Sequence, residues 1–158
     1  MKYIFITIAL LVSSLANGQK ITKKLKSTTI SGISIILGKS IDITKDDTTV
    51  FLSLQWRNEA YQVLADYTDL TFITEEARLQ FIDDLNAALK FFDNNEAVVW
   101  ERDQYKLSIS DTPGLKKYLF LTNDKGNSFV TIGKNNLIKL IDYISSCPMV
   151  KAKKKATN

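Results

Sequence analysis

The chain of 158 residues contains no histidine and one cysteine, Cys147. Without histidine, the Ser-His-Asp and Cys-His nucleophile systems and the commonest zinc ligand are excluded. One cysteine cannot form an intramolecular disulfide, and without histidine it cannot complete a structural zinc site. No cofactor and no metal are therefore expected. Cys147 is interpreted as a small apolar residue packed on the core, with a reactive thiol or an intermolecular disulfide as the alternative.

Long apolar runs and ligand-binding loop motifs are also lacking. After Leu15 no apolar run approaches the ~20 residues that a membrane-spanning helix needs, so an integral membrane protein is not expected. The six glycines form no phosphate-binding motif. Residues 124–127 have too few acidic ligands for a calcium loop and are expected to form a turn.

The first eighteen residues have the features of an export signal. Lys2 is followed by an almost wholly apolar run over residues 3–12, and small residues follow over 14–18 at a spacing that signal peptidase recognises. We expect a cleaved signal peptide, a mature start at Asn17 or Gln19, and a periplasmic or secreted protein. An uncleaved membrane anchor is the alternative.

Basic residues concentrate at the two ends. Between Ser27 and Val150, 12 Lys and Arg stand against 17 Asp and Glu, so this body has a net charge of −5. We expect a mobile basic arm over residues 19–28, one α+β domain over 29–149 with halves 29–94 and 95–147, and a basic tail over 150–158. Such ends are usually solvated, although they can also contact polyanions.

Apolar patterning predicts the same order of elements in both halves, four strands and then a helix. The predicted strands are 30–37, 48–56, 60–66 and 70–73 in the first half, and 97–101, 105–110, 117–122 and 128–132 in the second. The first helix has Thr74 as its N-cap and ends at residues 93–95. Leu137, Leu140, Ile141 and Ile144 mark the second helix.

The two halves also align without gaps at an offset of 59 residues. Ile73-Thr74 matches Ile132-Gly133, Leu79 matches Ile138, and residues 81–85 match 140–144. An internal duplication is one explanation, and two similar strand-to-helix junctions are the other.

The predicted fold is α+β with antiparallel sheets and two helices in the order ββββα-ββββα. This order is similar to the tandem β4α plan of the Whirly family, whose two sheets pack with pseudo-twofold symmetry. The resemblance is topological and assigns no site residue. It implies binding of single-stranded DNA, from which an exported chain with an acidic body departs. A single antiparallel sheet with two helices on one face fits the same pattern.

Aromatic and arginine residues gather at predicted strand ends, where sheet proteins often place binding residues. Trp56 and Arg57 end the second strand, Trp100 and Arg102 lie at the end of the fifth, and Tyr105 begins the sixth. Tryptophan and arginine contribute much of the energy of many interfaces. These residues form the candidate ligand site, while burial of both tryptophans in the core is the alternative.

No catalytic residue is identified. The adjacent acids Asp46-Asp47, Glu75-Glu76 and Asp83-Asp84 are interpreted as a turn, a first helical turn and a solvated helix face. We therefore predict an exported, non-enzymatic binding module of the bacterial cell envelope. Its expected partner is a protein or a glycan, not genomic nucleic acid. A carboxylate-based hydrolase of glycans or peptides and a polyanion binder using the terminal lysines are the alternatives.

Overall fold

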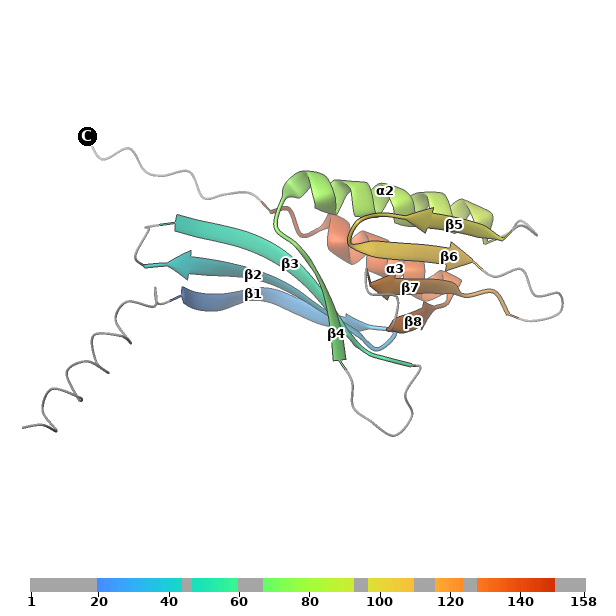
Figure 1. Ribbon diagram of the computed structural model, residues 1–158, viewed down its shortest axis with the longest axis horizontal. Coiled ribbons are helices and arrows are strands. Elements are labelled where there is room, and N and C mark those ends of the chain that lie inside the picture. Colours follow the sequence, from blue (N-terminus) through green and yellow to red (C-terminus); the bar gives the residue numbers. More distant parts are fainter. Residues whose placement is uncertain are drawn as a thin grey trace, which may run out of the picture.

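Two antiparallel four-stranded sheets and two helices make up the molecule in the computed structural model (Figure 1), which describes residues 20–43, 47–59, 67–92, 97–109, 116–123 and 128–149. The elements are β1 (Lys20–Ile30), β2 (Ile33–Asp42), β3 (Asp47–Arg57), β4 (Tyr67–Phe72), α2 (Glu75–Phe91), β5 (Val98–Glu101), β6 (Tyr105–Ile109), β7 (Leu119–Asn123), β8 (Phe129–Ile132) and α3 (Lys134–Ser145). One sheet has the strand order β1-β2-β3-β4 and the other β5-β6-β7-β8. The predicted ββββα-ββββα fold is confirmed, and the single-sheet alternative is wrong.

The basic segment expected to be a mobile arm is a strand. β1 pairs antiparallel with β2 from Lys20 opposite Asp42 to Ile30 opposite Ile33, with a bulge between Lys24 and Lys26. Ser31 and Gly32 form the connecting turn with φ values of 51° and 77°. A two-residue hairpin turn of type I′ requires positive φ at both of its central residues. The single strand predicted over 30–37 is therefore interrupted by a turn. The predicted strand 60–66 lies outside the described residues.

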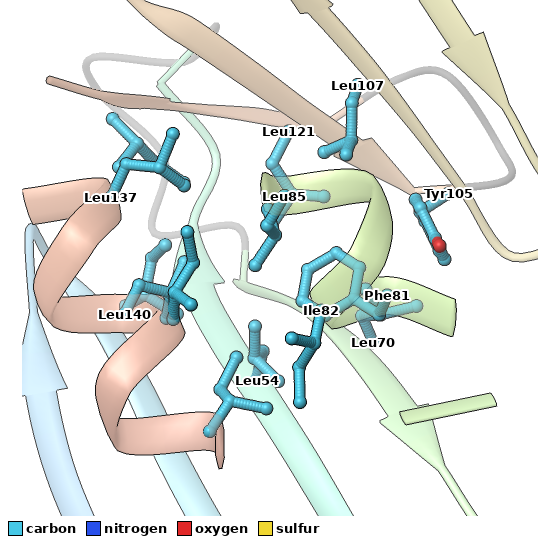
Figure 2. Packing of buried hydrophobic residues seen from close by; sticks show 14 of the residues in the cluster. Leu54, Leu70, Phe81, Ile82, Leu85, Tyr105, Leu107, Leu121, Leu137 and Leu140 are labelled. Carbon is cyan, nitrogen blue, oxygen red and sulfur yellow. The ribbon is translucent and has the colours of Figure 1, made fainter. Parts of the chain in front are cut away.

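The two helices place equivalent residues in the core. Thr74 Oγ1 accepts a hydrogen bond from the Ala77 amide at 3.2 Å and caps α2. At the 59-residue offset, four buried α2 positions match the four buried α3 positions: Arg78, Phe81, Ile82 and Leu85 correspond to Leu137, Leu140, Ile141 and Ile144. Side chains of both helices meet those of both sheets in one cluster (Figure 2). The ungapped helix alignment therefore identifies equivalent core positions.

The strand before each helix does not follow this alignment. Ile73 is 62% exposed, whereas its sequence match Ile132 is fully buried. Phe72 is the buried residue at the end of β4, so the first unit has one more residue between strand and helix. The exposed Ile73 occupies that extra position.

Each unit also contacts the sheet of the other. α2 packs against β5 and β6 of the second sheet as well as against β4, which precedes it in the chain, and α3 packs against β1. The Glu59 amide donates to the Phe129 carbonyl at 3.1 Å, and the Glu59 carboxylate accepts from Thr131 on β8. The halves 29–94 and 95–147 thus share one core.

The C-terminal end of α3 is held by the start of α2. Arg78 Nη1 donates to the Ile144 carbonyl at 2.8 Å, and Glu75 accepts from the Met149 amide at 2.9 Å. Cys147 is buried between these contacts, as expected for a small apolar residue. Neither helix in the described part of the chain is long and apolar enough to cross a membrane.

Candidate functional site

A buried carboxylate organises the candidate site. Asp84 on α2 is 4% exposed, because its helical position lies between the core residues Phe81 and Ala88. Arg102 donates to it twice, from Nε to Oδ2 at 2.7 Å and from Nη2 to Oδ1 at 2.8 Å. The Tyr105 hydroxyl donates to Oδ2 at 2.8 Å and Gln80 Nε2 donates to Oδ1 at 3.1 Å. Four donors therefore satisfy this carboxylate.

The β5–β6 turn brings Arg102 and Tyr105 to α2. The Arg102 amide donates to the Tyr105 carbonyl at 2.8 Å and closes the turn. Tyr105 lies on the core side of β6, where its ring meets Phe81 edge-on with centroids 4.8 Å apart (Figure 2). The Tyr105 ring therefore belongs to the core, and only its hydroxyl reaches the Asp84 carboxylate.

The charge of this cluster is fixed by its contacts. Burial raises the pKa of Asp84, but the hydrogen bonds and charge of Arg102, with Tyr105 and Gln80, outweigh burial and leave that pKa below its usual value. Burial and the hydrogen bond to Asp84 raise the pKa of Tyr105. The hydrogen bond and charge of Asp84 raise the pKa of Arg102. At neutral pH the carboxylate and guanidinium are ionised and the phenol is neutral.

An open hollow of about 440 Å³ lies beside this cluster. Its apolar lining comes from Phe72, Ala77 and Tyr105, and its exposed polar lining comes from Gln80, Glu101, Arg102, Asp103 and Gln104. The Arg102 side chain is 45% exposed although two of its nitrogens bind Asp84. Its Nη1 makes no hydrogen bond to the described residues and is oriented by the bonds that the other two nitrogens make.

The five residues predicted as a ligand site do not form one site. Arg102 and Tyr105 meet at Asp84, as described. Trp56 is 1% exposed on the core side of β3, so its ring offers no surface to a ligand. Arg57 is exposed at the end of β3 opposite Tyr67. Trp100 is half-buried against Phe91, with ring centroids 5.7 Å apart. The alternative, in which both tryptophans are buried in the core, fits Trp56 fully and Trp100 in part.

Sequence reasoning missed Asp84 and Gln80. The pair Asp83-Asp84 was interpreted as a solvated helix face, which describes the exposed Asp83 and is wrong for the buried Asp84. The available signal was the spacing of Asp84, three residues after Phe81 and four before Ala88, on the apolar stripe of the helix. An acid on that stripe needs a buried partner.

A second open hollow, of about 460 Å³, lies at the start of α3. Lys116, Lys117 and Lys134 line it together with Asn135 and Asn136. Gly133 is the N-cap and supplies no side-chain cap, and the first turn of α3 contains no acid. The surroundings of this hollow are therefore basic.

The described part of the chain contains no group of three or more acidic or cysteine side chains placed to hold a metal ion. In comparisons with known proteins, no family model and no curated protein matches this sequence. The fold defines a small α+β protein of two β4α units.

Proposed function

We propose that this protein is an exported, non-enzymatic binding module of the bacterial cell envelope, and that the hollow beside Arg102 receives a protein partner. The observation that carries the proposal is the orientation of Arg102. Asp84 holds the guanidinium through two nitrogens, while the Arg102 side chain, 45% exposed, lines a hollow with an apolar floor and a polar rim. Fixing this side chain in advance reduces the entropy lost on binding.

A protein partner fits this hollow better than a glycan. Sugar sites commonly offer the face of an exposed aromatic ring, whereas Phe72 and Tyr105 are buried here. Around Arg102 the rim instead has acidic and neutral hydrogen-bonding side chains, including Glu101, Asp103 and Gln104. Such a rim around a central arginine suits backbone carbonyls and mixed polar groups of a protein surface.

The state of Asp84 favours binding over hydrolysis. A hydrolase needs a carboxylic acid with a raised pKa or a free carboxylate nucleophile. The pKa of Asp84 is lowered, and its oxygens accept hydrogen bonds from Arg102, Tyr105 and Gln80. Glu101 and Asp103 also make the rim unfavourable for a polyanion.

Site-specific photocrosslinking in the native host tests the proposal. The crosslinking amino acid benzoylphenylalanine is placed at Gln104 or at Gln80, both on the exposed rim of the hollow. Gln55, exposed on the outer face of β3, is the matched control. We expect one discrete protein adduct from the two rim positions and none from the control.

Substitutions that add the same positive charge at the rim and at the control position extend this test. Gln104→Arg and Gln80→Arg introduce bulk into the hollow without removing a contact of the folded core, apart from the Gln80 bond to Asp84. They should abolish the adduct formed from the other rim position, while Gln55→Arg should leave it intact. Equal adducts from all three positions, or none from the rim, would contradict this function.

A further inference from the structure

A second surface, distinct from the hollow beside Arg102, is formed by the free edge of β1. We propose that this edge binds an acidic, extended peptide segment of a partner protein, which adds to the first sheet as a fifth strand. β1 is the outermost strand of its sheet and, among the described residues, pairs only with β2. Its residues 20–27 are all exposed. In Figure 1 the Lys20 end of the β1-β2-β3 sheet extends beyond both helices.

The charge of this edge selects the partner. β1 has the sequence KITKKLKSTTI, with four lysines and no acid, although the body that follows Lys26 has a net charge of −5. Lys39 on β2 stands directly opposite Lys23, so two positive charges are neighbours across the strands. Like charges in that position destabilise a sheet, and an acidic side chain beside Lys23 on an added strand would offset part of the repulsion.

Three of the β1 lysines are available for such a contact. Lys26 already donates from Nζ to Ser146 Oγ at 2.9 Å and lies over the Tyr143 ring at 4.7 Å. Lys20, Lys23 and Lys24 form no ion pair with any described residue. Lys20 and Lys24 share the outer face of the sheet, and Lys23 lies on the other face. An added strand therefore meets positive charge on both of its faces.

Apolar side chains stand beside these lysines. Ile21 is 52% exposed opposite Ile41, and Leu25 is 49% exposed at the bulge. An extended segment in which acidic and β-branched residues alternate would pair its acids with the lysines of one face and its apolar residues with Ile21. Its main chain would satisfy the free amide and carbonyl groups of the edge.

A second copy of the chain is a poor occupant of the same edge. Two β1 strands that pair antiparallel about a twofold axis place the lysines of residues 20–26 opposite one another. Lysines on an edge strand prevent self-association in this way. The same lysines favour an acidic strand, so one charge pattern excludes copies and admits the partner.

Binding of a synthetic peptide to the mature protein tests the inference. The probe is a capped octapeptide of alternating Glu and Val, compared with the Lys–Val octapeptide of the same length. NMR titration of the 15N-labelled protein should show saturable binding of the Glu–Val peptide alone. Amide hydrogen exchange should slow at alternate residues of β1, because only every second amide points to the free edge.

Charge-reversal variants locate the contact. Lys20→Glu/Lys24→Glu should weaken binding at least tenfold, whereas Lys116→Glu/Lys139→Glu, which makes the same charge change at exposed positions elsewhere, should not. Absence of Glu–Val binding would overturn the inference. Equal binding of poly-glutamate or heparin without protection of β1 amides would also overturn it and show a charge-only surface. The crosslinks at Gln104 and Gln80 report on the other site, so either proposal can fail alone.

Discussion

At the scale of single residues, Asp84 is a charged side chain in a buried position. A carboxylate with 4% exposure is costly unless it is paired, and three of its four hydrogen bonds come from a turn that lies eighteen to twenty-one residues further along the chain. Asp83, its neighbour on α2, is exposed. The two adjacent acids therefore provide a matched pair for testing the cluster.

Asp84→Asn should reduce the acid sensitivity of the fold. The pKa of Asp84 in the folded protein is lowered, so its contribution to stability is present above the unfolded-state pKa of about 4 and is lost as the pH falls through the folded-state value. At pH 7 the variant should lose about 1–3 kcal/mol of unfolding free energy, because hydrogen bonds to a charged group are lost. Urea unfolding between pH 3 and 7 measures both effects.

The matched control is Asp83→Asn, which should leave the pH profile of the wild type unchanged. If Asp84→Asn and the wild type lose stability equally between pH 5 and 3, the carboxylate is not the group that the cluster protects.

At the scale of elements, the two helices begin in different ways. α2 has the Thr74 cap, and Glu75 and Glu76 in its first turn favour the positive end of the helix. α3 begins at Gly133 without a side-chain cap or an acid. The backbone of Gly133 has φ −75° and ψ 158°, which any residue adopts, and a Cβ there would meet Tyr118 Cε1 at an ordinary 3.9 Å.

Gly133→Asp should therefore stabilise the protein. The carboxylate supplies the missing cap and enters the basic surroundings of Lys134 and Lys116, which together should add about 0.5–1.5 kcal/mol to the unfolding free energy. Gly133→Ala is the matched control, because it reduces backbone freedom in the unfolded chain without supplying a capping side chain. Thermal and urea unfolding measure the difference, and a Gly133→Asp variant no more stable than Gly133→Ala would contradict the capping argument.

At the scale of the whole molecule, the two β4α units behave as one folding unit. α2 packs on the second sheet, α3 packs on the first, and Glu59 bonds the β3 end to β8. Each helix therefore buries part of its apolar face against the other half. Because the two units share these contacts, we expect them to unfold together.

Both units should unfold in a single transition. Trp56 on β3 and Trp100 on β5 report on the first and second unit respectively, so Trp100→Phe and Trp56→Phe each leave one reporter. In each variant the midpoint of urea unfolding by fluorescence should equal that by far-ultraviolet circular dichroism. Separate midpoints in either variant would show two independent units.

The sequence by itself determined the order of elements, the buried stripe of α3 and the absence of histidine chemistry. These features are local, because apolar spacing and composition act within one element. The helix alignment at an offset of 59 residues is confirmed by the buried positions of α2 and α3. The basic strand β1 was missed because lysines at an exposed edge give no apolar alternation, although Ser31-Gly32 marked its turn.

Only the tertiary structure decided which polar residues meet. Arg102 and Tyr105 were selected for their place at strand ends, but their shared partner Asp84 lies on a helix of the other unit. The separation of Trp56 from Trp100 and the burial of Asp84 likewise depend on how two sheets and two helices pack. Such contacts join residues distant in the chain, and no pattern within one element specifies them.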